Sequence, residues 1–287
     1  MRANQGRLQG RVRTLFVSDV HLGSPFTQCE PFLEFLRGIE AERMYIVGDF
    51  LDGWKLQGGW RWQPTYTAIL RRLAEMADAG TELFYLSGNH DEFLRNDHLF
   101  SEIVRRFDFV TMGEEFVHHT ADGRRFLVTH GDRFDYVETS AKWLSKGSGI
   151  FYDALLSSSW YLSRLLGRRN LSPYRFCGMT KDRIKRMIRF IQRFEGCLLQ
   201  HARSRECDGV ICGHVHTPSI VHRDGMTYCN TGDWVENCTA LVEDDDGTLS
   251  LTCFYETGRQ SPAPEHVAPP AHESASRHAA AARGTLA

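Results

Sequence analysis

Short polar clusters recur along the chain, and each combines residue types that bind metals or transfer protons. In chain order they are Asp19-x-His21, Asp49-x-x-Asp52, Asn89-His90-Asp91, His130-Gly131-Asp132 and His214-x-His216. Carboxylate, imidazole and amide groups without a thiolate suit Mn²⁺, Fe²⁺ or Zn²⁺. These groups outnumber the ligands that one ion needs, so the pattern indicates a site for two divalent metal ions.

Any one of these clusters also has an ordinary explanation. Lone histidines are commonly structural, and an Asp or Asn after a strand is commonly a turn or helix cap. Five clusters at five predicted strand ends favour a metal site instead. Two divalent cations opposed by two aspartates leave a net charge of roughly +2, which favours a bound phosphate and lowers the pKa of a metal-bound water. The predicted chemistry is in-line attack of a metal hydroxide on phosphorus.

Each cluster directly follows an apolar run that reads as a buried strand. The predicted strands are 12–17, 44–47, 83–86, 125–128 and 209–212, and helical spacing of apolar residues predicts helices near 32–39, 69–76 and 184–194. The first part is therefore β-α-β-α-β, and open α/β sheets place their chemistry at the carboxyl ends of such strands. Further strands are predicted at 107–110 and 116–119. Four later segments predict an antiparallel-leaning second sheet, at 219–222, 226–229, 238–242 and 248–255.

Taken together, the five ordered motifs resemble the calcineurin-like metallophosphoesterase superfamily over residues 12–256. The resemblance implies an α/β fold, specifically an α+β four-layer sandwich of two mixed sheets flanked by helices. It implies that Asp19, His21, Asp49 and His216 hold one metal, and that Asp49, Asn89, His130 and His214 hold the other. It places His90 outside the ligand set, where it stabilises developing charge or protonates the leaving oxygen, with Asp91 orienting it. Asp52 is either an orienting partner or a loop acceptor.

Within the superfamily, 18–23, Asp52-Gly53-Trp54, a helical insertion and 229–234 resemble the UDP-2,3-diacylglucosamine diphosphatase-like branch. That branch implies hydrolysis of the pyrophosphate of a UDP-linked diacyl sugar in lipid A biosynthesis, usually with Mn²⁺. Its pathway enzyme typically has Arg where this chain has His90, which leaves the substrate open. The alternatives are a phosphodiesterase acting on nucleotides or nucleic acid, and a non-catalytic scaffold that retains the fold.

The insertion, at about 134–178, is rich in aromatics and leucine, with arginines interspersed. This composition fits an ordinary helical core, or a cap that receives an amphiphilic phosphoester and makes peripheral contact with the inner membrane. Trp54 is a possible wall of the substrate pocket. Lys181 and Lys185 either reach the substrate phosphate or belong to a solvated basic face.

Composition bounds these interpretations. The chain has 287 residues, 42% of them hydrophobic, which is enough for one large domain with an ample core. The formal charge of -2 gives no indication of extended nucleic-acid binding. Scattered cysteines without a C-x-x-C pair and a polar start predict a reducing, cytoplasmic setting. We predict a flexible N-terminus at 1–10, a metallophosphoesterase domain at 11–257 and a disordered tail at 258–287. No oligomeric state is predicted.

Overall fold

The computed structural model describes residues 10–56, 62–96, 109–135 and 181–255, without the side chains of 54, 56, 95, 96 and 181–189. The chain divides into one unit at Met1–Thr257 and a second at Gly258–Ala287. The second unit, which is the predicted tail, lies outside the described residues. So do 1–9 of the predicted N-terminus and 136–180, which hold nearly all of the predicted cap.

In the described ranges, the first sheet has six strands in the order β11-β10-β1-β2-β3-β4. Its parallel strands are β1 (Gly10–Val17), β2 (Ile39–Val47), β3 (Glu82–Leu86) and β4 (Val110–Gly113). Helix α1 (Cys29–Gly38) connects β1 to β2, and helix α3 (Pro64–Asp78) lies between β2 and β3. The predicted β-α-β-α-β order is confirmed. The strand predicted at 107–110 begins only at its last residue, because Phe109 lies in a turn.

The second sheet has five strands in the order β5-β6-β7-β9-β8. They are β5 (Phe116–His119), β6 (Arg125–Val128), β7 (Gly209–Cys212), β8 (Ser219–Arg223) and β9 (Met226–Asn230). Strands β6, β7 and β9 are parallel, whereas both edge strands pair antiparallel to their neighbours.

The last two strands correct the prediction of one antiparallel-leaning sheet from 219 to 255. Strand β10 (Thr239–Glu243) pairs antiparallel with β1 of the first sheet, and β11 (Leu249–Cys253) pairs with β10. Every residue of β10 is buried. Its Ala240 and Val242 belong to the core beneath the helices, and Leu241 belongs to the core between the sheets. Burial of both faces therefore explains why β10 occupies an inner position of the larger sheet.

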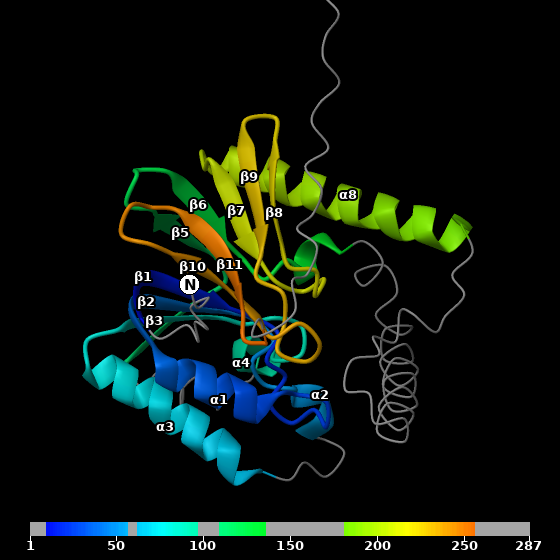
Figure 1. The fold of residues 1–287 in the computed structure, drawn as a ribbon. Coiled ribbons are helices and arrows are strands. Elements are labelled where there is room, and N and C mark those ends of the chain that lie inside the picture. The colour runs from blue at the N-terminus through cyan, green and yellow to red at the C-terminus, as the bar shows by residue number, and fades with distance from the viewer. Residues whose placement is uncertain (1–9, 57–61, 97–108, 136–180, 256–287) are drawn as a thin grey trace, which may run out of the picture. The chain divides into compact units, whose positions relative to one another are not determined.

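Four layers follow from this pairing (Figure 1). Helices α1 and α3 cover the outer face of the six-stranded sheet and bury Phe32, Leu36 and Ile69 against it. Helix α8 (Lys181–Ser204) packs on the outer face of the five-stranded sheet. The short helices α2 (Gly53–Leu56), α4 (Phe93–Asn96) and the 3-10 turn η1 (Asp132–Phe134) lie in connections that follow strands. The predicted sandwich of two mixed sheets flanked by helices is confirmed.

A buried polar group joins the two sheets. The carboxylate of Glu243 on β10 is fully buried and accepts hydrogen bonds from Thr14 Oγ1 at 2.7 Å and from Ala121 N at 2.8 Å. His118 Nε2, on β5 of the other sheet, lies 2.8 Å from Glu243 Oε2, and Arg13 Nη1 lies 2.5 Å from Oε1. Burial acts to raise the pKa of Glu243, but the hydrogen bonds from His118, Thr14 and Ala121 outweigh it and lower the pKa to about 2.

Candidate metal centre

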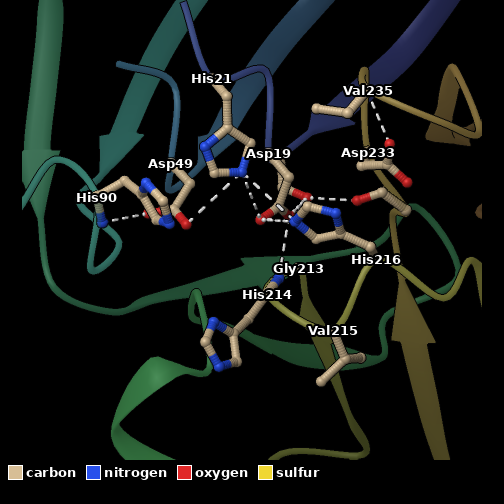
Figure 2. Close-up of polar contacts among 12 residues, drawn as sticks. Asp19, His21, Asp49, His90, Gly213, His214, Val215, His216, Asp233 and Val235 are labelled. Carbon is tan, nitrogen blue, oxygen red and sulfur yellow. Dashed lines mark hydrogen bonds and ion pairs between the residues drawn. The ribbon is translucent and has the colours of Figure 1, made fainter. Parts of the chain in front are cut away.

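The predicted ligands lie in the loops that follow the strands of both sheets. Asp19 and His21 follow β1, Asp49 follows β2, Asn89 follows β3, His130 follows β6, and His214 and His216 follow β7. Backbone hydrogen bonds join neighbouring loops, from Asp19 N to Gly48 O at 3.1 Å and from His21 N to Asp49 O at 2.9 Å. His214 N donates to Asp19 Oδ2 at 3.0 Å, which ties the second sheet to the first (Figure 2).

Among the residues that the structure describes, three groups of side chains bring possible ligand atoms within 4.8 Å of one another. They are Asp19/His21/His216, Asp49/His130/His214 and His21/Asp49/His90. The first two correspond to the two predicted sites, and Asn89 joins the second because its Oδ1 lies 3.3 Å from His130 Nε2. The third group contains His90, and the role of His90 outside the ligand set stays a prediction.

The donor atoms fit divalent cations. Asp19 and Asp49 are 0% and 2% exposed, so their charges require a partner. Within the described part of the chain, the buried Oδ1 of Asp19 makes no hydrogen bond, and it lies 3.2 Å from His216 Nε2 as an ion-pair contact. His21 Nε2 and His216 Nε2 lie 3.4 Å apart, and the two side chains point toward each other (Figure 2). Carboxylate and imidazole groups arranged in this way are typical of Mn²⁺, Fe²⁺ or Zn²⁺ sites.

Two of the proposed ligands, Asp19 and His21, have protonation states that suit metal binding at neutral pH, whereas His216 would first have to lose a proton. Burial acts to raise the pKa of Asp19, but His216 and His130 outweigh it and the pKa is lowered to about 2. Burial and the nearby His90 lower the pKa of His21 to about 4, so its imidazole is neutral. Burial opposes a proton on His216, yet Asp19 raises its pKa to about 9. A cation bound beside Asp19 would displace that proton.

Five of the predicted ligands have left-handed backbone conformations. The φ angles are 54° for Asp19, 52° for His21, 52° for Asp49, 70° for His214 and 50° for His216. Residues other than glycine rarely adopt such angles, because Cβ approaches the following carbonyl oxygen. Strain of this kind concentrates at functional sites. These backbone conformations have no signature in the sequence.

Glycines let the backbone pack directly against the ligands. A Cβ on Gly88 would overlap the carboxylate of Asp49 and the ring of His130. A Cβ on Gly213 would overlap the carboxylate of Asp19. Glycine is therefore required at positions 88 and 213, because the backbone there lies too close to the ligands for any side chain to fit.

The group near His90 corrects one expected contact. Asp91 was the expected orienting partner, but the carboxylate on His90 Nδ1 is Asp52, whose Oδ1 lies 3.2 Å away. The buried Asp91 instead accepts hydrogen bonds from Phe50 N, Gly88 N and Tyr85 Oη, which fix the loop.

Charge and burial also act on both residues of this loop. Burial and the charge of Asp49 raise the pKa of Asp91 to about 6. Burial acts to lower the pKa of His90, but Asp49 and Asp52 outweigh it and raise the pKa. A protonated His90 is suited to stabilise negative charge or to donate a proton.

A set of hydrogen bonds behind His216 involves residues that were not among the predicted site residues. Asp233 is fully buried, and its Oδ1 accepts hydrogen bonds from Val235 N at 2.8 Å and Glu236 N at 2.5 Å. Asn237 Nδ2 donates both to Asp233 and to the backbone oxygen of His216, the latter at 3.0 Å. The only signal was the Gly-Asp-Trp sequence after β9, which was noted for its resemblance but given no role.

Three predicted substrate contacts stay predictions. Trp54 lies in α2, and Lys181 and Lys185 lie in the first turns of α8. Their side chains are outside the described part of the structure.

The chain is similar to several known proteins. The UDP-2,3-diacylglucosamine hydrolase of Porphyromonas gingivalis is 32% identical over 268 residues, covering 82% of this chain and 95% of that protein. The protein of the same name from Neisseria gonorrhoeae is 24% identical over 245 residues, with the same coverage. The solved structure of Yfce, a phosphoesterase from E. coli, is 16% identical, covers 85% of this chain and 94% of that one, and has a TM-score of 0.42.

The family assignment rests on a longer match than any single motif. Residues 12–218 match the calcineurin-like phosphoesterase family. The match includes the loops after β1, β2, β3, β6 and β7. These loops carry the side chains of Asp19, His21, Asp49, His90, His214 and His216 that Figure 2 shows. The chain belongs to the calcineurin-like phosphoesterase family.

Proposed function

We propose that this chain is a phosphohydrolase that works with two divalent metal ions, Mn²⁺ in the first place. The family makes it a hydrolase of phosphodiester or pyrophosphate bonds that uses divalent metal ions. The observation that carries the two-ion proposal is the sharing of Asp49. This buried carboxylate groups with His130 and His214 on one side and with His21 on the other, and His21 in turn groups with Asp19 and His216.

The residues divide by role. Asp19, His21, Asp49 and His216 would hold one ion, and Asp49, Asn89, His130 and His214 would hold the other. Bound there, the ions would neutralise phosphate charge and supply an activated water. His90 would face the phosphate and stabilise its developing charge or protonate the leaving oxygen, held in place by Asp52 at 3.2 Å. The glycines at positions 88 and 213 leave space for the ligands.

The substrate we propose is UDP-2,3-diacylglucosamine or a related amphiphilic sugar nucleotide, cleaved at its pyrophosphate. Support comes from curated relatives that carry this name and match over 82% of the chain. We further propose that the segment at about 134–178 receives the apolar part of the substrate and contacts the membrane surface peripherally. Among the described helices, none combines the length and apolarity that a membrane span needs.

The reaction is tested by removing metal with a chelator and restoring it with Mn²⁺, Fe²⁺ or Zn²⁺. Three substrates are compared: UDP-2,3-diacylglucosamine, a simple aryl phosphodiester and a cyclic nucleotide. We expect Mn²⁺ to restore turnover, with UMP and the lipid sugar 1-phosphate as products. Faster turnover of the cyclic nucleotide would instead assign a nucleotide phosphodiesterase.

Two ligand variants test the site itself. Asn89→Ala and His130→Ala are expected to lose turnover because each removes a ligand to the second ion. Full turnover by both variants would contradict the assignment. Membrane contact is tested separately, by sedimentation of the whole chain with anionic vesicles. Failure to sediment with the vesicles would contradict membrane contact and leave the hydrolase assignment intact.

A further inference from the structure

We infer that Asp135 is a positioning residue for the metal centre, acting through His214. Its Oδ2 lies 3.1 Å from His214 Nε2, and the two side chains are only 14% and 9% exposed. Asp135 belongs to none of the sequence motifs that indicated the site. The inference rests on the proposed function, because it concerns the second of the two proposed ions.

A hydrogen bond from His214 Nε2–H to this carboxylate selects one tautomer of the imidazole. In that tautomer the lone pair lies on Nδ1, which is then available to bind the ion. Metal-binding histidines commonly donate their other N–H to a carboxylate, which fixes the ring and makes it a stronger ligand. The interaction is largely shielded from water, so it is also stronger than the same pair would be at the surface.

The turn that carries Asp135 is braced independently of any ion. Gly131 has a φ of 108° and redirects the chain into η1, where Phe134 N donates to Gly131 O at 2.9 Å and Asp135 N donates to Asp132 O at 3.2 Å. The ring of Phe134 packs on His201 of α8, with centroids 5.0 Å apart. Asp135 is thus held at a fixed place, as a residue that orients another must be.

His214 is confined from its other sides as well. Its backbone N–H donates to Asp19 Oδ2 at 3.0 Å, and its ring lies edge-on to that of His130 at 5.3 Å. The ring of Phe194 on α8 lies 6.0 Å away. Asp135 adds the polar contact that sets the protonated nitrogen, which packing alone does not determine.

The test measures Mn²⁺ binding to the metal-free whole chain by the electron paramagnetic resonance signal of unbound Mn²⁺. The wild type is expected to bind two ions. Asp135→Ala is expected to weaken one of them on the order of 10- to 100-fold. Asp135→Asn should weaken it less, because its amide oxygen still accepts the hydrogen bond. Asp132→Asn is the matched control, since it removes one negative charge from the same turn.

Each outcome decides a separate point. If the wild type binds no Mn²⁺, the proposed function fails. If it binds two ions and Asp135→Ala binds both equally well, the inference about Asp135 is overturned. Equal weakening in Asp132→Asn and Asp135→Asn also overturns it, because charge on the turn would then suffice. Circular dichroism of the metal-free variants checks folding. If Asp135→Ala is unfolded, the comparison of Asp135→Asn with Asp132→Asn decides, and wild-type affinity in both is a refutation.

Discussion

Replacing Glu243 by Gln is expected to change how the stability of the protein depends on pH. The buried carboxylate has a pKa lowered from 4.5 to about 2 by its hydrogen bonds with His118, Thr14 and Ala121, despite burial. Because the pKa of Glu243 is lower in the folded protein than in the unfolded chain, the ionised carboxylate stabilises the fold at pH values above the pKa of the unfolded chain. This stabilisation disappears as the pH falls toward the pKa of the folded protein. The shift corresponds to about 3 kcal/mol at pH 5.5 and above, at about 1.4 kcal/mol per pKa unit.

The assay is urea unfolding of wild type and Glu243→Gln between pH 5.5 and pH 3. The wild type should be the more stable at pH 5.5. The difference in unfolding free energy should then narrow by about 2 kcal/mol by pH 3, where about half or less of the contribution remains. Glu42→Gln is the control, because Glu42 makes an exposed pair with Arg11, and its replacement should change the unfolding free energy only slightly. A Glu243→Gln difference that stays constant with pH would refute the reasoning.

Three further predictions concern the site and its support. Gly88→Ala should weaken Mn²⁺ binding on the order of tenfold or more, because a Cβ there would overlap the Asp49 carboxylate. The control Gly196→Ala should leave Mn²⁺ binding unchanged, because a Cβ at position 196 meets open space. Equilibrium dialysis with metal analysis measures Mn²⁺ binding in both variants. His90→Ala should lower kcat on the order of 10²- to 10⁴-fold while both ions stay bound, and loss of an ion would make His90 a ligand. Phe194→Ala, at a 2% exposed position, should cost about 3–5 kcal/mol in urea unfolding, and a loss under 1 kcal/mol would contradict its burial.

Much of the fold could be predicted from periodicity. The apolar runs at 125–128 and 209–212 coincide with β6 and β7, because an apolar run of about four residues bounded by turns is too short for a buried helix. Sheet membership was harder. Nothing local in 238–242 distinguishes pairing with β9 from pairing with β1, since that choice depends on which sheet edge is open in three dimensions.

The candidate site was likewise predictable only in part. Residue types after strands predicted which side chains converge, because parallel strands deliver their carboxyl ends to one edge. Orientation within the site was not predictable in this way. Asp91 is next to His90 in sequence, yet Asp52 provides the carboxylate at His90 Nδ1. Asp135 likewise reaches His214 from 79 positions away, through a turn whose direction only the fold determines.

The left-handed ligands have a consequence for any effort to make this protein more robust. Each non-glycine residue in that conformation costs on the order of 1–3 kcal/mol. Glycine at Asp19, His21, Asp49, His214 or His216 would relieve that cost and delete a proposed ligand in the same step. Selection for heat resistance alone should therefore favour substitutions that inactivate the protein at these positions. A screen that couples survival at high temperature to catalysis would be needed to avoid them.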